Sequence, residues 1–198
     1  MRRDKGTKSI IFKLIENASI QILNFTIGII LARVLSPSDY GVYSILLIFI
    51  NIGQTAVVAG LNSALIQRAD IDEDDYSTVF TVSLMFAFCV YFLLFIGSPL
   101  IAEIYASKDV VMPLRILSII LFPQALYSVV NARIARRMEF PFAAKISIIS
   151  VIIAGIISVF MALNSAGIWA HVVQQILTYS VFPAFYCIQN RWMPKFRF

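Results

Sequence analysis

Six long apolar runs dominate this sequence, and they constrain its fold more than any other feature. A helix needs about 20 apolar residues to cross the hydrocarbon core of a bilayer, and each run reaches that length. Barrel strands would instead alternate apolar and polar residues over about ten positions, unlike these continuous runs. We therefore predict an all-α, polytopic membrane helical bundle of six transmembrane helices, at about residues 10–35, 40–66, 76–104, 110–134, 142–163 and 166–187.

The composition agrees with a membrane protein. Hydrophobic residues make up 60% of the 198 residues and charged residues only 14%, whereas soluble domains are about half apolar and a quarter charged. The net charge of +5 does not indicate nucleic-acid binding, because the basic residues sit at the ends of the runs without interleaved aromatic residues. No metal site is expected, since Cys89 and Cys187 lie inside apolar runs and no Cys/His cluster has ligand spacing.

Helix-initiating residues stand between the runs. Ser36, Pro37 and Asp39 combine an N-cap serine, a proline at the first helical position and an acid at the third. The acidic loop around Asp72 lacks the glycine and distal glutamate of a calcium-binding EF-hand, so we expect it to cap the third helix. Pro123 and Pro183 each remove a backbone donor inside a run and should bend or loosen their helices.

Lysine and arginine predict the orientation of the helices. With a cytoplasmic N-terminus, thirteen basic residues fall on the cytoplasmic side and three on the other. The three are Arg33, Lys108 and Arg115; the thirteen are Arg2, Arg3, Lys5, Lys8, Lys13, Arg68, Arg133, Arg136, Arg137, Lys145, Arg191, Lys195 and Arg197. The excess of basic residues on one side predicts that both termini are cytoplasmic.

Polar residues form stripes inside the runs. In three runs they recur at offsets of 0, 4, 7 and 11 residues, which places them on one helix face. These stripes are Asn17, Gln21, Asn24 and Gly28; Asn51, Thr55, Val58 and Asn62; and Gln124, Ser128, Asn131 and Ala135. In the last run, His171, Gln174, Gln175 and Thr178 share a face, and the fifth run carries the small residues Ser147, Ser150, Ala154 and Ser158.

Two interpretations of the stripes remain open. Amides and hydroxyls in a membrane either form hydrogen bonds between helices or line a hydrated cavity. Four helices with stripes rich in Asn and Gln supply more polar groups than packing requires. The sequence therefore favours a central cavity for a polar, hydrogen-bonding cargo such as a sugar.

Four further residues have alternative roles. Glu16 either pairs with Lys13, three residues before it, or acts as a coupling carboxylate for protons or cations. Arg33 and Arg115 either extend to lipid headgroups or face inward and bind a phosphate on the cargo. His171 is either a packed neutral histidine or a coupling group that titrates near neutral pH.

The basic cluster Arg133, Arg136, Arg137 and Lys145 is an orientation signal in contact with anionic lipid or, alternatively, a site of attraction for a lipid pyrophosphate. No catalytic constellation accompanies it. The sequence has no Gly-rich phosphate loop, no Ser/His/Asp grouping and no pair of carboxylates confined to the membrane. We expect no enzyme activity and no cofactor.

Seven segments along the chain are typical of a known family. They are ILARVLSPSDYGVY from Ile30, LNSALIQR from Leu61, STVF from Ser77, LRILSIIL from Leu114, ARRMEF from Ala135, GIWAHVVQQIL from Gly167 and the closing RWMPKFRF. Together they resemble the lipopolysaccharide and O-antigen flippases of the multidrug, oligosaccharidyl-lipid and polysaccharide exporter superfamily, and the resemblance covers nearly the whole chain in order.

This resemblance implies translocation of undecaprenyl-pyrophosphate-linked sugar repeats across the bacterial inner membrane. Members of the family have two six-helix lobes facing each other across a central cavity. The chain therefore resembles an N-terminal lobe, and RWMPKFRF resembles the cytoplasmic link to a second lobe. A lone lobe would expose its stripes to lipid, so we expect a second lobe or a homodimer partner.

The sequence thus predicts a flippase for polysaccharide or lipopolysaccharide precursors, whose partners are a lipid-linked oligosaccharide and membrane lipids. The alternative is a non-transporting membrane subunit, or a truncated fragment, associated with polysaccharide biosynthesis. We expect Arg33 and Arg115 to bind the pyrophosphate, and Glu16 and His171 to be coupling candidates. Sugar is expected to bind the amides of Asn17, Gln21, Asn24, Asn51, Asn62, Gln124, Asn131, Gln174 and Gln175.

Overall fold

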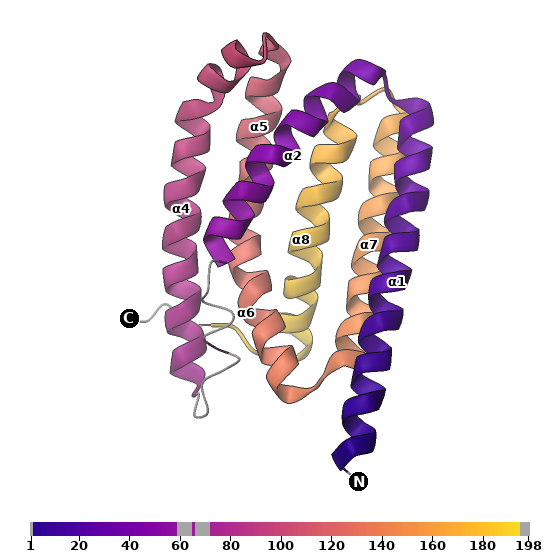
Figure 1. Ribbon diagram of the computed structural model, residues 1–198, viewed down its shortest axis with the longest axis vertical. Coiled ribbons are helices and arrows are strands. Elements are labelled where there is room, and N and C mark those ends of the chain that lie inside the picture. The colour runs from indigo at the N-terminus through magenta and orange to yellow at the C-terminus, as the bar shows by residue number, and fades with distance from the viewer. Residues whose placement is uncertain (1, 59–64, 66–71, 195–198) are drawn as a thin grey trace.

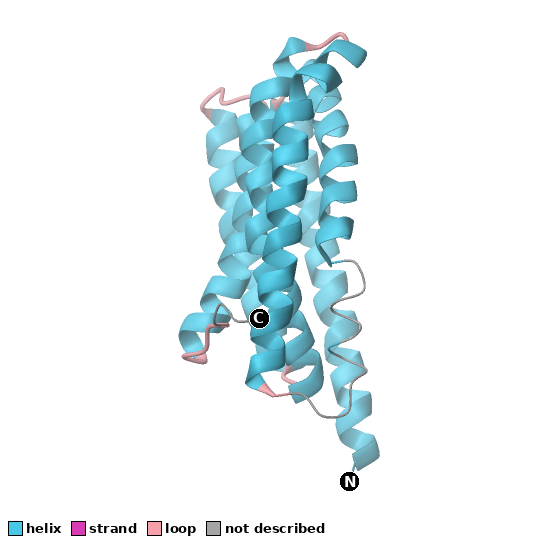
Figure 2. Ribbon diagram, turned by 90° about the vertical axis from the view of Figure 1, so that its left-hand side faces the viewer, coloured by secondary structure: helices cyan, strands magenta, loops and turns pink. Residues whose placement is uncertain are grey.

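The computed structural model describes the backbone of residues 2–58, 65 and 72–194, with side chains from Lys13 onward. These residues form helices and no strand (Figures 1 and 2). The α-helices are α1 (Arg2–Val34), α2 (Pro37–Val58), α4 (Glu73–Ile104), α5 (Val111–Leu117), α6 (Leu121–Arg137), α7 (Phe140–Leu163) and α8 (Trp169–Gln189). Two 3₁₀-helices, Lys108–Val110 and Ser118–Ile120, flank α5.

The predicted run at 110–134 is a helix with an interruption. The 3₁₀-helix Ser118–Ile120 separates α5 from α6 shortly before Pro123. A proline cannot donate to the carbonyl four residues earlier, here Ile119, and its ring crowds that carbonyl. The backbone tightens into a 3₁₀ turn at this point, as expected from the proline. Pro183, in contrast, lies inside an unbroken α8.

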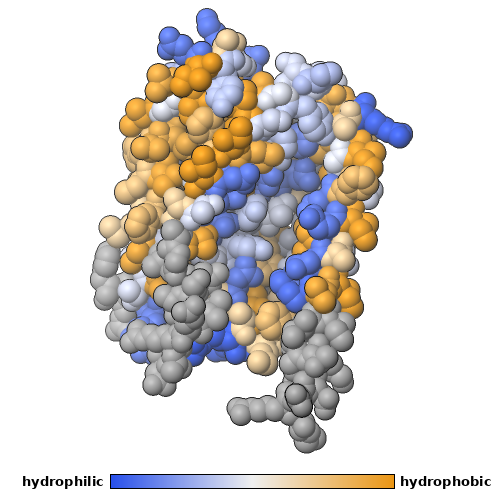
Figure 3. Space-filling model, viewed as in Figure 1, coloured by the Kyte–Doolittle hydropathy of each residue, from blue (hydrophilic) through white to orange (hydrophobic). Residues whose placement is uncertain are grey.

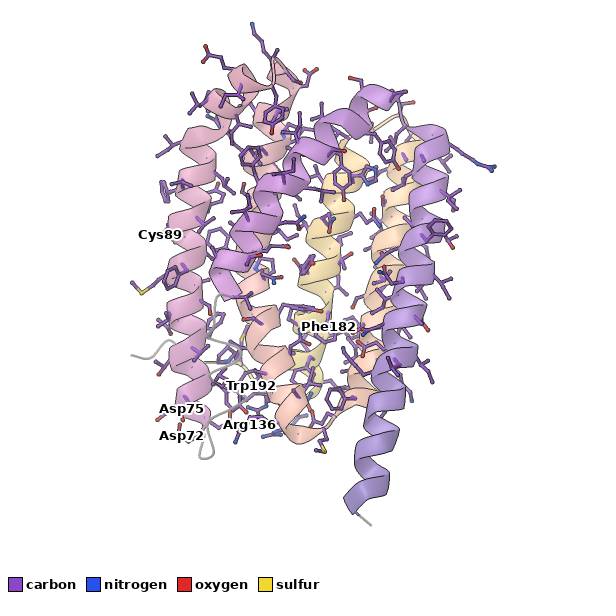
Figure 4. All side chains as sticks on the ribbon, in the orientation of Figure 1. Asp72, Asp75, Cys89, Arg136, Phe182 and Trp192 are labelled. Carbon is purple, nitrogen blue, oxygen red and sulfur yellow. The ribbon has the colours of Figure 1, made fainter. Side chains whose placement is uncertain are left out.

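The predicted caps are confirmed. Ser36 Oγ accepts from the Asp39 backbone N–H at 3.2 Å, and Asp39 Oδ2 accepts from the Ser36 backbone N–H at 3.2 Å. Asp72 and Asp75 form the same reciprocal arrangement at the start of α4, at its lower end in Figure 4. Each box satisfies backbone donors that helix geometry leaves unpaired.

Successive long helices alternate in direction (Figure 1). The connection from α1 to α2 lies at the upper end, and so does the connection from α7 to α8, where Ser165 and Gly167 have φ of 61° and 55°. Gly167 adopts this left-handed conformation without strain. Helices α1 and α7 therefore begin, and α8 ends, at the lower end of the bundle.

Four clusters of buried apolar residues hold the described part of the chain together, and two of them position α1 and α2. Buried apolar residues of α2, α4, α5 and α6 form the larger core, whereas α1 packs along α7 around Ile27 and Leu31. At Gly155 the backbone of α7 approaches α1 so closely that a Cβ there would lie 2.3 Å from Ile27 Cδ1. Small residues allow such close approach between membrane helices. This contact holds α1 against α7, while α2 leans across the bundle toward α4 and α6.

Within the described residues, five stretches are long and apolar enough to cross a membrane. They are Lys13–Val34, Pro37–Val58, Glu73–Ile104, Lys108–Arg137 and Phe140–Leu163. The described part of the chain is thus all-helical, and the chain is a multi-pass membrane protein. Helix α8 has 21 residues and runs alongside α7 (Figure 1), but its glutamines and histidine keep it out of this set.

Gly155→Val should lower stability by about 1–3 kcal/mol, because the added side chain overpacks the contact with Ile27. Gly97→Val in α4 is the matched control, since a Cβ at Gly97 meets nothing within 4 Å. The midpoint of thermal unfolding in detergent measures both. Equal midpoints for the two variants would show that the α1–α7 contact does not depend on this glycine.

Candidate functional site

A polar groove opens between α1 and the helices α2 and α8. Figure 3 shows hydrophilic residues along α1 and across the centre of the same face, with apolar surface on the outer flanks. The larger cavity in this groove has a volume of about 430 Å³. It is lined by Asn24, Gly28, Tyr40, Tyr43, His171, Gln174, Gln175, Thr178 and Tyr179.

A smaller cavity of about 160 Å³ continues the groove toward the lower end of the bundle. It shares Asn24, Thr178 and Tyr179 with the larger one. Ser147 and Ser150 of α7 contribute to its wall, as does Phe182, which lies low on α8 in Figure 4. The small side chains of α7, which the sequence marked as suited to close packing, also leave room for this cavity.

The stripe of α1 forms one wall of the groove. Asn24 and Gly28 line the larger cavity, and Gln21 and Asn17 are exposed one and two turns before Asn24 on the same face. The side of α1 next to this stripe packs on α7 through Ile27 and Leu31. One helix thus presents amides to the groove and aliphatic side chains to its neighbour.

The stripe of α8 forms the facing wall. Gln174, Gln175 and Thr178 line the cavity, and Gln175 Nε2 donates to Tyr43 Oη at 2.7 Å. Thr178 Oγ1 donates to the Gln174 carbonyl at 2.8 Å. The structure therefore brings together the stripes of α1 and α8, which are far apart in sequence.

Tyrosines that the sequence analysis missed complete the cavity. Tyr40 Oη donates to the Gly28 carbonyl at 3.1 Å, which ties α2 to α1. The ring of Tyr43 stacks on His171 with centroids 4.0 Å apart, and Tyr40 meets the same imidazole edge-on at 5.1 Å. Their three-residue spacing in the first turns of α2, on the face toward α1 and α8, was the available signal.

The stripes of α2 and α6 do not line either cavity. Asn51 and Thr55 are exposed on α2, and Asn131 is half-buried on α6. Gln124 is half-buried, and its Oε1 has no hydrogen-bond partner among the described residues. The fourth member of the α2 stripe, Asn62, lies outside the described residues.

The two candidate phosphate ligands differ in surroundings. Arg33 is exposed in the last turn of α1 and forms no ion pair within the described part of the chain. Arg115 instead packs on α4, where its Nε donates to Ser98 Oγ at 2.8 Å and its guanidinium lies 4.4 Å from the Phe95 ring centroid. The structure does not bring Arg115 to the groove.

The two coupling candidates are both buried. Glu16, 3% exposed, accepts from Lys13 Nζ at 3.0 Å, the pairing that the sequence offered as one alternative. His171 is 4% exposed, and neither ring nitrogen has a hydrogen-bond partner among the described residues. Only His171 of the two lines the groove's cavities.

At the lower end of the bundle, part of the basic cluster has a structural role. Glu73 Oε2 accepts from Arg133 Nη1 and, at 2.6 Å, from Trp192 Nε1. The Arg133 guanidinium also lies over the Trp192 ring, 4.1 Å from its centroid. Figure 4 shows Trp192 beside the lower part of α4 and α6. This cluster joins α4, α6 and the segment after α8, whereas Lys145 is exposed.

Comparison with known proteins identifies a family to which most of the chain is similar. A family model described as "Polysaccharide biosynthesis protein" matches residues 30–198. This range includes α2 and α8 and the upper end of α1, and thus most of the larger cavity. No match to a solved structure was found.

Two similar proteins carry descriptive names. The succinoglycan biosynthesis transport protein ExoT of Rhizobium meliloti (strain 1021) is 29% identical over 176 residues, which cover 89% of this chain and 36% of that protein. The teichuronic acid biosynthesis protein TuaB of Bacillus subtilis (strain 168) is 28% identical over 148 residues, covering 73% and 30%. The chain spans about a third of the length of these curated relatives.

Cysteines placed along the groove should react with a membrane-impermeant maleimide if the groove is hydrated. In a background with Cys89→Ala and Cys187→Ala, we expect Asn17→Cys, Gln21→Cys and Asn24→Cys to be labelled. Phe25→Cys is the control, because Phe25 is 71% exposed on an apolar surface and should contact acyl chains. Protection of all three stripe cysteines would contradict a hydrated groove.

Glu73→Gln should lower stability by about 1–3 kcal/mol, because Arg133 is buried and would lose its charged partner. The side chain of Glu73 is 56% exposed, so solvent screening moderates the effect. Glu103→Gln near the other end of α4 is the control; Glu103 is exposed and forms no ion pair among the described residues. Denaturation midpoints in detergent would be compared, and equal values for both variants would rule out a stabilising role for the cluster.

Proposed function

Because the chain belongs to the polysaccharide biosynthesis protein family, we propose that it takes part in translocating lipid-linked oligosaccharides across a bacterial inner membrane. The observation that carries this proposal is a polar groove in a bundle built of apolar helices. Amides from α1 and α8 and hydroxyls from α2 line it. Such groups are expensive to expose to lipid and suit a polar cargo.

In this proposal, α8 is the sixth transmembrane helix. Its polar side chains lower its average hydropathy, but they belong to the groove, while Phe182 and Tyr186 pack into the apolar core with α6 and α7. With six spans, the beginning of α1 and the end of α8 are on the same side of the membrane. The distribution of lysine and arginine makes that side the cytoplasm.

The proposal also requires a partner that covers the groove. In a bilayer, exposed amides such as Asn17 and Gln21 would face acyl chains. The relatives are about three times as long as the matched segment, which is consistent with a second lobe facing this one. A second copy of the chain would satisfy the same physical requirement.

The residues have distinct proposed roles. Arg33 binds the pyrophosphate, because it is an exposed charged group in the last turn of α1 and forms no ion pair among the described residues, although it lines neither cavity. The amides of α1 and α8 bind sugar hydroxyls, and His171 is the better placed of the two coupling candidates. Arg115 contributes less than Arg33 to binding the pyrophosphate, since its guanidinium already contacts Ser98 and Phe95.

The test is translocation of a fluorescent undecaprenyl-pyrophosphate-linked oligosaccharide in proteoliposomes that contain the full chain. We expect Arg33→Gln to slow translocation by a factor of about 10 to 150, since a lost charge-assisted hydrogen bond weakens binding by about 1.5–3 kcal/mol. Lys108→Gln removes an exposed cation at the same end and should leave the rate unchanged.

Equal rates for Arg33→Gln and the unmodified chain would remove the phosphate role of Arg33. Absence of translocation by a folded chain would favour the other hypothesis, a membrane subunit that supports polysaccharide biosynthesis without transporting.

A further inference from the structure

The larger cavity is lined by uncharged polar and aromatic side chains, a narrower set than that of the groove as a whole. Among the described residues that line it, none is a lysine, arginine, aspartate or glutamate. It combines three tyrosines, two glutamines, an asparagine, a threonine and a histidine with the open backbone of Gly28. A phosphate or carboxylate ligand binds most strongly to arginine or lysine, and neither is among the residues that line this cavity.

The tyrosines are held in place before any ligand arrives. Tyr43 is fixed by its stack on His171 and by the hydrogen bond from Gln175. Tyr40 is fixed by its hydrogen bond to the Gly28 carbonyl and by its edge contact with His171. Rigid aromatic residues provide large contact area at low entropic cost, which favours binding of a ring-shaped ligand.

Hydrogen-bonding capacity remains after these contacts are made. The Gln175 amide donates one N–H to Tyr43, and an amide carries a second N–H and an accepting oxygen. His171 is buried, and neither ring nitrogen forms a well-aligned hydrogen bond to a described residue, although the side chain of Gln174 lies near it. A buried polar group without a partner is unfavourable, so a hydroxyl that reaches the imidazole after a small side-chain movement would relieve this.

We propose that this cavity is a subsite for an uncharged sugar ring. The apolar face of the ring packs on tyrosine, and its hydroxyls bind Gln174, Gln175 and His171. The volume of about 430 Å³ is at the lower end of the range for ligand pockets and fits one or two sugar rings. The proposal rests on the proposed function and adds that the phosphate of the cargo binds elsewhere.

The test uses the full chain in nanodiscs with Cys89→Ala, Cys187→Ala and Gly28→Cys. A Cβ at Gly28 meets nothing within 4 Å, so the thiol fits in open space at the cavity. Maltose at about twice its Kd should slow maleimide labelling about threefold, since binding reduces the free fraction to 1/(1 + [L]/Kd). Nanodiscs are used because the headgroup of a maltoside detergent is maltose and would compete with the added sugar.

Selectivity is measured with sodium glucuronate and inorganic phosphate at the same concentration. We expect neither to slow labelling of Gly28→Cys. The positional control is Lys108→Cys, exposed at the upper end of the bundle and outside the cavity, whose labelling should be insensitive to maltose. Equal protection by glucuronate or phosphate, or no protection by maltose, would overturn the proposal.

Two substitutions locate the sugar. Tyr43→Phe keeps the ring and should retain most of the protection, whereas Tyr43→Ala removes the platform and should abolish it. If Tyr43→Ala does not fold, Gln174→Ala, which leaves the tyrosines in place, should raise the Kd for maltose about tenfold. Unchanged protection in Tyr43→Ala, or in Gln174→Ala where that variant replaces it, would exclude this cavity as the binding site.

Comparison with the translocation assay separates the two proposals. Protection by maltose without translocation of the lipid-linked probe would retain the subsite and contradict transport by this chain. Translocation without protection by maltose would retain transport and contradict the subsite.

Discussion

The exclusion of polar groups from hydrocarbon is the constraint on which this structure depends. Backbone donors and acceptors are satisfied within the helices, as the bilayer requires. Side-chain amides are not satisfied by the backbone of their own helix, so they must form hydrogen bonds with one another, with water or with a partner. Asn24 on α1 and Gln174 and Gln175 on α8 therefore line one groove, while large apolar side chains such as Phe25 and Phe160 are exposed on the outer flanks.

The groove exists because α1 is held away from α2. Close packing at Gly155 keeps α1 on α7, and the capped turn at Ser36 sends α2 across the bundle toward α4 and α6. Only the first turns of α2 stay near α1, where Tyr40 reaches the Gly28 carbonyl. At the lower end, Glu73, Arg133 and Trp192 join α4, α6 and the segment after α8. The groove thus lies between two packed parts of one bundle.

Much of the helical architecture was predictable from the sequence. Apolar runs mark the helices because a spanning helix must be apolar along its length, and the caps at Ser36 and Asp72 follow from residues close in sequence. Pro123 indicated a weakened helix, and a 3₁₀ turn precedes it. The count of six spans stays a prediction, because α8 combines helix length with a polar lining.

The candidate site was predictable only in part. Which helix faces are polar follows from the order of the residues, since a face is set by spacing within one helix. Which faces meet depends on the packing of the helices: α1 and α8 share the cavity with Tyr40 and Tyr43, while Arg115 packs on α4. These contacts result from side-chain fit between distant segments, such as Gly155 against Ile27. Spacing along a single helix carries no information about that fit.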